Sequence, residues 1–398
     1  MLHNANDTSK KQYDIVVVGS GPAGATTARF AAAKGLSVLL VDKKQELGSP
    51  IQCSGAVSYN ALEQAGVFPS SEFILEPIYG FGIYNTTGEN KIVDYRELKP
   101  AEYGTNPGTK PLGYVVDRRR FDRYLMTQAE RAGATVWLKT EACGFRNLPD
   151  GTCEVDLKNF NQRLSINAKV MVAADGVQSQ AGKWAGMKTH IKLSELASCL
   201  QFVVDGVETQ GLLEIVTGHQ WAPGGYAWVF PKGHGYAEIG LGITRTMCEE
   251  NAQVYLDRFI KNSFFKDRFK NCRILEIQGG GVPLAAPLKI QYADNIILAG
   301  DAARHVNAIT GGGIHTALSS GKIAGEFLSA LILSGKPCTA NNLKGYQDKW
   351  LVAMGNTMWK LYRTKKKIFD TADILHRDEM LYQTMSGYFG TESEYKKI

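Results

Sequence analysis

The sequence has no long hydrophobic segment. No uninterrupted apolar stretch reaches the roughly 18 residues that a membrane-spanning helix needs. The opening segment, MLHNANDTSKKQ, is polar and lacks the apolar core of a signal peptide, so 1–12 is predicted to be a flexible tail. We therefore expect a cytoplasmic protein, either free in solution or peripheral at the inner face of the cell membrane.

The sequence also lacks cysteine motifs and a strong charge bias. Its seven cysteines form no CxxC pair and no His/Cys spacing suited to zinc, so we expect a reducing compartment and no metal site. The net charge of +6 is compatible with an acidic substrate, an anionic membrane surface or an acidic electron donor, and selects none of them. We expect no nucleic-acid partner, and the oligomeric state stays open.

The 398 residues are enough for two or three domains. The buried-strand patterns YDIVVVG and SVLLVD enclose an Ala-rich helix, which predicts a βαβ unit. Longer, aromatic-rich strands then predict an antiparallel sheet, before NIILAGDAA returns to the first pattern. We expect an α/β protein, α+β overall, with a Rossmann-like cofactor-binding domain over 13–193 and 288–335, an inserted antiparallel-sheet substrate domain over 194–287 and a C-terminal helical region over 336–398.

The turn after the first strand reads Gly-Ser-Gly-Pro-Ala-Gly, from Gly19 to Gly24. In such a motif Gly19 allows the tight turn, Gly21 lets the backbone approach a pyrophosphate, and Gly24 lets helix pack on strand. Free N–H groups of the first helical turn, which contains Ala23, would bind the phosphates. Asp42 ends the next strand, where a carboxylate can accept hydrogen bonds from a ribose. A chance glycine-rich turn and a surface acid are the simpler alternatives.

Two later segments favour a flavin over a nicotinamide. Asp175 follows a buried strand in Ala-Ala-Asp-Gly, and Gly300 and Asp301 begin Gly-Asp-Ala-Ala after another. An acid at such a strand end can hold ribityl hydroxyls. Gly312 and Gly313 precede a long helix, whose N-terminus can stabilise negative charge on a reduced isoalloxazine. The sequence therefore predicts FAD as the resident cofactor.

The segments GSGPAG, GYVVDRRRFDRYL, VAADG and GDAARHVNAITGGGI together resemble the p-hydroxybenzoate hydroxylase-like FAD family. The resemblance is greater to its geranylgeranyl reductase branch, which includes archaeal digeranylgeranylglycerophospholipid reductases, and it covers Tyr13 to about Gly335. It implies FAD-dependent reduction of prenyl double bonds, most of all in archaeal-type lipid precursors. It also implies that Arg118 lies against the FAD, that Asp301 contacts the ribityl and pyrophosphate region, and that Lys43, Cys53, Ala142 and Ile314 contribute further cofactor contacts.

The segment Gly-Tyr-Ala-Trp-Val-Phe-Pro-Lys, from 225 to 232, resembles the substrate-pocket motif of those reductases. Tyr226, Trp228 and Phe230 alternate along a strand and therefore share one face. Pro231 is expected to end this strand and to belong to the same substrate pocket. This face could line a prenyl tunnel, and its rings could stabilise positive charge on a protonating alkene. An ordinary sheet core is the alternative.

The proton donor is less clear from the residues. Cys53 lies in a loop that the resemblance brings close to the flavin, where it could donate a proton or shape the site, or be a small buried residue without chemistry. Tyr226 and Trp228 are further candidates for pocket or proton-relay roles. His305, Tyr114 and Lys232 are weaker candidates, because such residues more often serve as plain hydrogen-bonding groups.

The sequence departs from the branch in two loops. It has Pro-Ile-Gln-Cys-Ser-Gly-Ala over 50–56 where a C-G-E-G-like turn is usual, and Asn307-Ala308 where Asp-Pro is common. Both loops would lie near the isoalloxazine. The departures bear on the substrate and on the electron donor, which could be NADPH bound transiently or a reduced ferredoxin-type protein.

Three further readings stay open. The chain could be an aromatic monooxygenase, a reductase of a menaquinone or chlorophyll-precursor side chain, or a flavin-bound lipid carrier without catalysis. The run WLVAMGNTMWKLYRTKKKIF, over 350–369, mixes large apolar residues with lysines. It could rest on a membrane and help to extract a lipid, or it could pack against the body of the protein.

Overall fold

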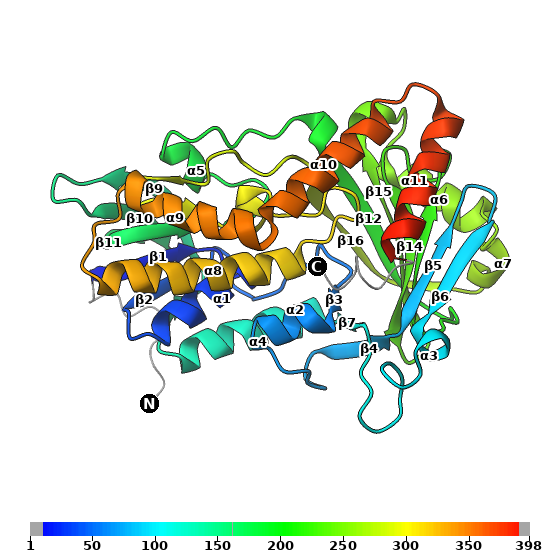
Figure 1. Cartoon of the computed structure of the whole chain (residues 1–398), viewed down its shortest axis with the longest axis horizontal. Helices are drawn as coiled ribbons and strands as arrows, with labels where there is room; N and C mark the ends of the chain where they lie inside the picture. The colour runs from blue at the N-terminus through cyan, green and yellow to red at the C-terminus, as the bar shows by residue number, and fades with distance from the viewer. Residues whose placement is uncertain (1–10, 161, 390–398) are drawn as a thin grey trace.

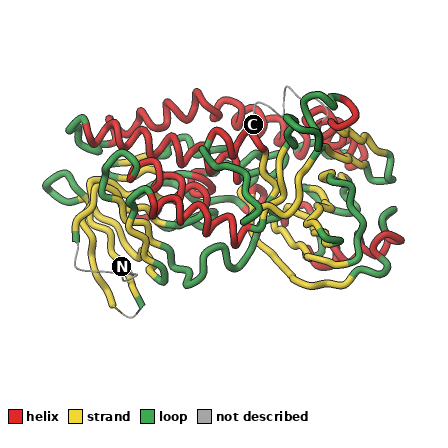
Figure 2. Tube along the Cα trace, turned by 90° about the horizontal axis from the view of Figure 1, so that it is seen from below, coloured by secondary structure: helices red, strands yellow, loops and turns green. Residues whose placement is uncertain are grey.

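The structure, a computed structural model, describes residues 11–160 and 162–389. Most of the predicted tail over 1–12 lies outside the described residues, and Gln12 already begins the first strand. The two larger sheets lie at opposite ends of the molecule, and a layer of helices runs from one to the other along one side (Figures 1 and 2). The predicted α/β fold with a helical C-terminal region is confirmed.

The first sheet has the order β17-β18-β11-β1-β2-β8, with the β9–β10 hairpin attached to β11. Alternate side chains of β1 are buried in two different clusters on opposite faces: Ile15 and Val17 in one, Val16 and Val18 in the other. A strand covered on both faces needs an unbroken apolar run, which is why this segment reads YDIVVV. The strands are β1 Gln12–Val18, β2 Val38–Val41, β8 Thr135–Trp137, β9 Thr140–Asn147, β10 Cys153–Asn159, β11 Gln162–Ala173, β17 Tyr292–Ala293 and β18 Ile296–Leu298.

Two helices cross this sheet in close contact, α1 (Pro22–Ala32) and α8 (Ile314–Leu333). A Cβ on Gly321 of α8 would lie 2.4 Å from the carbonyl oxygen of Ala23, and one on Gly325 would lie 2.8 Å from that of Thr27. Glycine is therefore required at both positions, because the two backbones leave no room for a side chain. The long helix predicted after the triple glycine is confirmed.

The second sheet has the order β16-β12-β15-β14-β13-β5-β6. The expected antiparallel sheet within 194–287 is present, but two of its strands come from 80–94, a segment predicted from the sequence to belong to the cofactor-binding domain over 13–193. The β13–β5 pair is also parallel, so the sheet is not antiparallel throughout. Its strands are β5 Gly80–Tyr84, β6 Asn90–Asp94, β12 Leu196–Asp205, β13 Leu212–Thr217, β14 Tyr226–Gly233, β15 Tyr236–Thr244 and β16 Arg273–Pro283.

A small sheet of order β3-β7-β4 connects the two halves. Its strands are β3 Ala56–Ser58, β4 Ile74–Ile78 and β7 Gly113–Val116. The remaining helices before α8 are α2 Tyr59–Gln64, α3 Tyr95–Leu98, α4 Arg118–Arg131, α5 Ala181–Trp184, α6 Ala252–Asn262 and α7 Lys266–Phe269. The predicted division into domains remains a proposal, in which we now place 80–94 with the substrate sheet.

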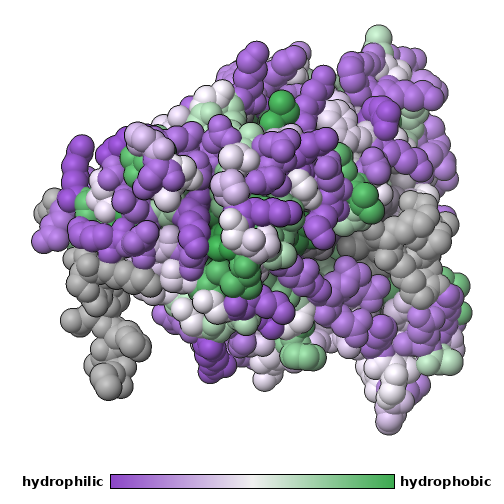
Figure 3. Space-filling view, turned by 60° about the vertical axis from the view of Figure 1, so that its left-hand side comes forward, coloured by the Kyte–Doolittle hydropathy of each residue, from purple (hydrophilic) through white to green (hydrophobic). Residues whose placement is uncertain are grey.

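The C-terminal helices run from the first sheet to the second (Figure 1). They are α9 Ala340–Trp350, the π-helical turn Leu351–Gly355, α10 Asn356–Phe369 and α11 Ile374–Phe389. Helix α11 packs on the second sheet, where Leu381, Met385 and Phe389 join Phe81 and Trp228 in one buried cluster. Within the described residues, no helix is both long and apolar enough to cross a membrane. The face in Figure 3 is mostly hydrophilic, with small hydrophobic areas among the polar residues.

The close packing of α1 on α8 generates a stability prediction. We expect Gly321→Val to destabilise the fold by about 2 kcal/mol or more, because the added side chain must push the two helices apart. Urea unfolding followed by circular dichroism measures the change. Gly387→Ala in α11 is the matched control: its Cβ would meet nothing within 4 Å, so it should be neutral or slightly stabilising. Equal losses in both variants would contradict the packing argument.

Candidate active site

A cavity of about 430 Å³ extends from the glycine-rich turn of the first sheet to the aromatic face of the second. The loop 48–58, the loop before α8 and the end of α11 form its other walls. Segments from both sheets and from both ends of the chain therefore meet at one place. Of the residues predicted from the sequence, those that line the cavity are Gly21, Ala23, Cys53, Tyr114, Arg118, Tyr226, Trp228, Phe230, Gly300, Asp301, Gly312, Gly313 and Ile314.

The three motif glycines have different structural reasons. Gly19 has a φ of +101°, and a Cβ there would lie 2.3 Å from the Ala174 carbonyl oxygen. A Cβ on Gly24 would lie 1.8 Å from the carbonyl oxygen of Gly19, so no side chain fits. A Cβ on Gly21, in contrast, would meet nothing within 4 Å. Gly19 and Gly24 thus build the turn, whereas Gly21 leaves space in front of it.

Two helices begin at this cavity without a side-chain cap. Neither α1, which starts at Pro22, nor α8, which starts at Ile314, has a side chain hydrogen-bonded to its first N–H groups, and neither has an acid in its first turn. These N–H groups and the positive ends of the two helix dipoles can therefore bind anionic groups. This arrangement fits the pyrophosphate of FAD at one helix and an electron-rich ring edge at the other.

Two of the three strand-end acids predicted for FAD, Asp42 and Asp175, lie within two positions of residues that line the cavity. Asp42 accepts hydrogen bonds from the Ser20 backbone and hydroxyl, at 2.9 and 2.5 Å, and from Lys44 N at 2.8 Å. Asp175 uses Oδ2 to accept from two N–H groups at the start of α5, while its buried Oδ1 has no hydrogen-bond partner within the part of the chain that the structure describes. A buried oxygen left free is costly, so Asp175 fits a site that a polar ligand completes.

Arg118 joins the loop of Cys53 to helix α4. Its guanidinium donates twice to the Asp122 carboxylate, at 3.0 Å each. Burial opposes the charge, but Asp122 and the Cys53 thiol outweigh it and raise the pKa of Arg118. Burial also raises the pKa of Asp301 to about 6, which Arg118 partly offsets. The cavity lining therefore includes the Arg118 guanidinium, which stays protonated, and the Asp301 carboxyl, whose pKa lies near 6.

The aromatic residues of β14 form a continuous wall. The rings of Tyr226 and Trp228 are 5.8 Å apart, and those of Trp228 and Phe230 are 6.2 Å apart. Gly240 on β15 makes room for the indole, because a Cβ there would lie 2.5 Å from it. Pro231, expected to end the strand and to belong to the substrate pocket, is buried but does not line the cavity, and β14 continues past it to Gly233. These side chains belong to a packed core and also line the cavity. The pocket wall and the sheet core, which the sequence left as alternatives, are therefore the same surface.

The loop before α8 is tied to the substrate side twice. The Tyr226 hydroxyl donates to the carbonyl of Thr310, and Asn307 Nδ2 lies 2.8 Å from the Tyr388 hydroxyl of α11. Asn307 Oδ1 also accepts from the backbone of Ile309 and Thr310. The side chain at the position where the family commonly has Asp therefore connects the flavin-side loop to the C-terminal helix.

Several predicted residues lie elsewhere. Asp42, Lys43, Ala142 and Asp175 do not line the cavity, and Lys43 is exposed, so their roles at the cofactor remain predictions. His305 is also outside the cavity lining. It stacks on Trp350 at 4.2 Å, its Nε2 lies 3.0 Å from Gln291 Oε1, and burial lowers its pKa to about 3, which fits the plain hydrogen-bonding role given as the alternative.

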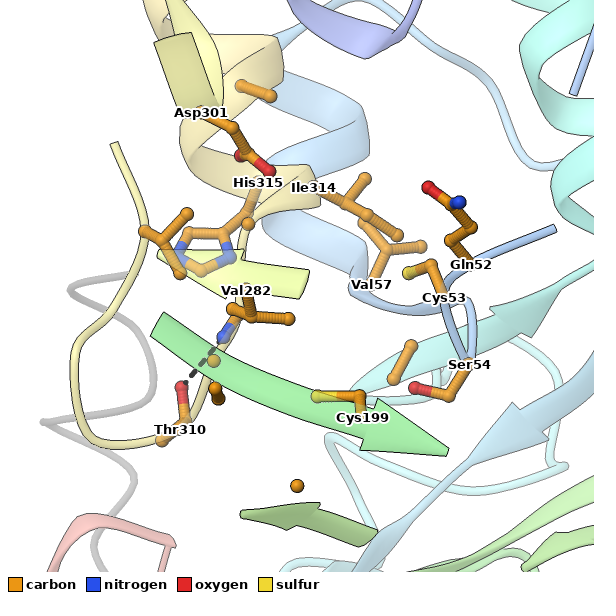
Figure 4. Close-up of a pocket in the computed structure, with 18 of the residues that line it drawn as sticks. Gln52, Cys53, Ser54, Val57, Cys199, Val282, Asp301, Thr310, Ile314 and His315 are labelled. Atoms are coloured by element: carbon orange, nitrogen blue, oxygen red, sulfur yellow. Dashed lines mark hydrogen bonds between the residues drawn. The ribbon is translucent and has the colours of Figure 1, made fainter. Parts of the chain in front are cut away.

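The cavity residues that sequence reasoning missed include His315 and Cys199. His315 follows Ile314 at the start of α8, burial lowers its pKa to about 4, and its Nε2 has no partner among the described residues. Cys199 lies on β12, across the cavity from Cys53 and Ile314 (Figure 4). The place of His315 two residues after the triple glycine motif was a signal for it, whereas no motif marked Cys199.

Family models match both halves of this site. A geranylgeranyl reductase catalytic domain matches 195–282, and an FAD binding domain matches 12–212. Reductases of archaeal lipids match along most of the chain: digeranylgeranylglycerophospholipid reductase 2 of Methanosphaera stadtmanae is 34% identical, with coverage of 91% of this chain and 89% of the relative. The chain belongs to the geranylgeranyl reductase family. Its cofactor is FAD, and it is an FAD-dependent oxidoreductase that acts on carbon–carbon double bonds.

Other members of the family agree with this assignment. The digeranylgeranylglycerophospholipid reductase of Methanothrix thermoacetophila is 37% identical, with coverage of 86% of this chain and 84% of the relative. The crystal structure of a geranylgeranyl bacteriochlorophyll reductase-like protein from Thermoplasma acidophilum superposes with a TM-score of 0.82 at 28% identity, covering 98% of this chain and all of that one. The geranylgeranyl reductase fold thus extends over the whole described chain.

The motif glycines generate a cofactor prediction. We expect Gly21→Val to fold with a stability within about 0.5 kcal/mol of the parent, because its side chain enters open space. The same side chain would occupy the approach to the pyrophosphate, so FAD affinity should fall by about tenfold or more. Flavin fluorescence titration and thermal unfolding measure the two effects. Gly24→Val, which would collide with Gly19, should instead prevent folding, and normal FAD binding by Gly21→Val would contradict the assignment.

The raised pKa of Asp301 generates a pH prediction. The folded-state pKa of about 6 lies above the ordinary value of 3.8, so ionised Asp301 opposes folding above about pH 6 and the penalty disappears as the pH falls below about 4. We expect flavin-free Asp301→Asn to be more stable than the parent, by on the order of 1–2 kcal/mol, at about pH 7.5. The two should converge at about pH 4 in urea unfolding. A difference that is constant with pH would contradict this account.

Proposed function

We propose that this protein uses FAD to reduce the geranylgeranyl double bonds of digeranylgeranylglycerophospholipid-type membrane lipid precursors. The archaeal relatives are named for that reaction. The observation that carries the proposal is the continuity of the cavity: uncapped helix N-termini line one end, and aromatic and aliphatic side chains line the other. A long apolar chain can therefore reach a cofactor held at the first end.

The apolar half of the cavity suits a prenyl chain. Besides the β14 wall, it is lined by Phe81 and Leu213 from the sheet and by Leu381 and Phe389 from α11. These side chains exclude water and present ring faces that stabilise positive charge as an alkene is protonated. Bound FAD would supply the hydride equivalent, while the residues around it hold the alkene and deliver the proton.

Cys53 is our proposed proton donor or proton-relay residue. It lines the cavity at the point where the two halves meet, and it packs beside Val57, Val116 and Ile314. Tyr226 is less suited to the role, because burial raises its pKa and its hydroxyl is donated to Thr310. Tyr226, Trp228 and Phe230 are proposed to contact the substrate and to orient it.

The electron donor is proposed to be NADPH, bound transiently, or a reduced ferredoxin-type protein. The basic run Arg118–Arg120 does not form a docking surface by itself, because Arg118 lines the cavity and Arg119 pairs with Glu276 at 2.8 Å. In the basic run Lys365–Lys367, Lys365 is buried, Lys366 is exposed but pairs with Asp370, and Lys367 is exposed. Reduction of the bound flavin by each candidate donor in turn would decide between them.

We also propose peripheral contact with a membrane, made through the surface of the segment 350–369. Of the run over 350–369, the large residues Trp350, Met358 and Ile368 are buried against the body of the protein. The exposed positions are mostly polar or basic, with Val352 as an exception at 83% exposure. Contact with an anionic membrane would therefore be made by basic side chains more than by an inserted apolar face.

An anaerobic single-turnover experiment tests the proposed function. The flavin is reduced with dithionite, an unsaturated digeranylgeranyl glycerophospholipid is added, and flavin absorbance and lipid mass are followed together. We expect the flavin to reoxidise and the lipid to gain two hydrogens for each double bond reduced, because the hydride and the proton both enter the alkene.

The controls separate this reaction from its rivals. The fully saturated lipid should leave the flavin reduced, and a menaquinone or a chlorophyll precursor with a prenyl side chain tests those substrates directly. Flavin that stays reduced until oxygen is admitted, with lipid mass unchanged, would contradict the proposal and favour an aromatic monooxygenase.

A further inference from the structure

A buried ion pair lies at the end of the aromatic wall. Lys232 Nζ is 2.8 Å from Glu238 Oε2, and the two side chains are 10% and 0% exposed. Lys232 lies where the β14–β15 register shifts, two residues after Phe230, and Glu238 is the cross-strand neighbour of Phe230. Removing two charges from water is costly, and apolar residues of similar size often stabilise a fold as well or better. Stability alone does not account for this pair.

The ammonium has another partner on a distant segment. Lys232 Nζ donates a hydrogen bond of 2.8 Å to the carbonyl oxygen of Ser54, which is 178 positions away in the sequence. Ser54 follows Cys53 directly, and both residues line the cavity (Figure 4). The bond thus connects the sheet of the substrate half to the turn that carries the candidate proton donor.

The same turn is also held from the cofactor side. Val116 N donates to the carbonyl of Gly55 at 3.0 Å, and Gly55, with a φ of +85°, lies so close to Val116 that a Cβ would be 2.3 Å from its carbonyl oxygen. The buried Arg118 guanidinium contacts the Cys53 thiol. These contacts come from β7 and α4. Lys232 approaches the turn from the opposite sheet, so it determines how the turn lies relative to the aromatic wall.

We propose that Lys232 is a positioning residue, which holds the Cys53 turn between the two halves of the cavity while Glu238 compensates its charge. The inference rests on the proposed function for its effect on turnover. The position of the turn itself can be measured without lipid, because a thiol on a loosened turn reacts faster with an alkylating reagent.

The test is the double variant Lys232→Met/Glu238→Leu in flavin-loaded protein. It removes both charges together, so no charge is left buried and unpaired, but the Ser54 carbonyl loses its donor. Alkylation of Cys53 by iodoacetamide is followed by mass spectrometry of the peptide that contains it. We expect the alkylation rate of Cys53 to be about tenfold higher than in the parent, because a hydrogen bond from a charged donor no longer holds the turn in place. Lys232→Arg, which keeps a cationic donor, should restore a rate close to the parent value.

A matched control comes from an ion pair between the same sheet and helix α7. Arg268 and Glu214 are 2.6 Å apart, with side chains 22% and 11% exposed. Arg268→Met/Glu214→Leu should perturb the sheet to a similar extent and leave the labelling of Cys53 unchanged. If the Lys232→Met/Glu238→Leu protein does not fold, Lys232→Gln/Glu238→Gln replaces it, because its amides can bond to each other and the shorter Gln no longer reaches Ser54.

The outcomes separate this inference from the proposed function. Unchanged labelling of Cys53 in the folded double variant, or an equal increase in the control pair, would overturn the positioning role. If the variant is labelled faster and the parent protein reduces no prenyl lipid, the positioning role is supported and the proposed function is contradicted. If the parent protein reduces the lipid and labelling is unchanged in the variant, the proposed function is supported and the positioning role is contradicted.

Discussion

The backbone of the Gly19–Gly24 turn lies so close to its neighbours that two of its three motif glycines exclude any side chain. Because of this close approach, α1 begins directly after the carboxyl end of β1 and packs against it. Gly321 and Gly325 then allow α8 to pack against α1 with the same lack of space. The uncapped beginnings of both helices consequently face one cavity, and the binding of an anionic cofactor there depends on that geometry.

The substrate half depends on the cofactor half through a few polar contacts across the cavity. Tyr226 binds the carbonyl of Thr310, Asn307 bonds to Tyr388 of α11, and Lys232 binds the carbonyl of Ser54. Each contact joins segments more than 80 positions apart in the sequence. Apolar packing can bring two halves together at many small displacements, whereas hydrogen bonds between buried groups specify one of them. These contacts therefore set the distance between the aromatic wall and the cofactor end.

The elements that could be predicted from the sequence are those whose signal is local. Strands of the first sheet need unbroken apolar runs because both faces are covered, one by α1 and α8 and the other mainly by the β9–β10 hairpin. The glycine motif needs its spacing because the turn is tight. The strands at 80–94 were not assigned to the second sheet, because nothing in a short alternating pattern says which sheet it joins. The burial of His305 against Trp350 could not be predicted from the sequence either, because the two residues are far apart in the chain.

The sequence by itself determined the Rossmann-like turn, the FAD cofactor, the family and the alternation that puts three aromatic side chains on one face. Each of these depends on spacing within one segment, which backbone geometry converts directly into structure. Only the tertiary structure decided that His315 and Cys199 line the cavity, that α11 closes its apolar end, and that Lys232 reaches the Cys53 turn. Those are contacts between segments far apart in the chain, and they exist only after the two sheets have packed around a common space.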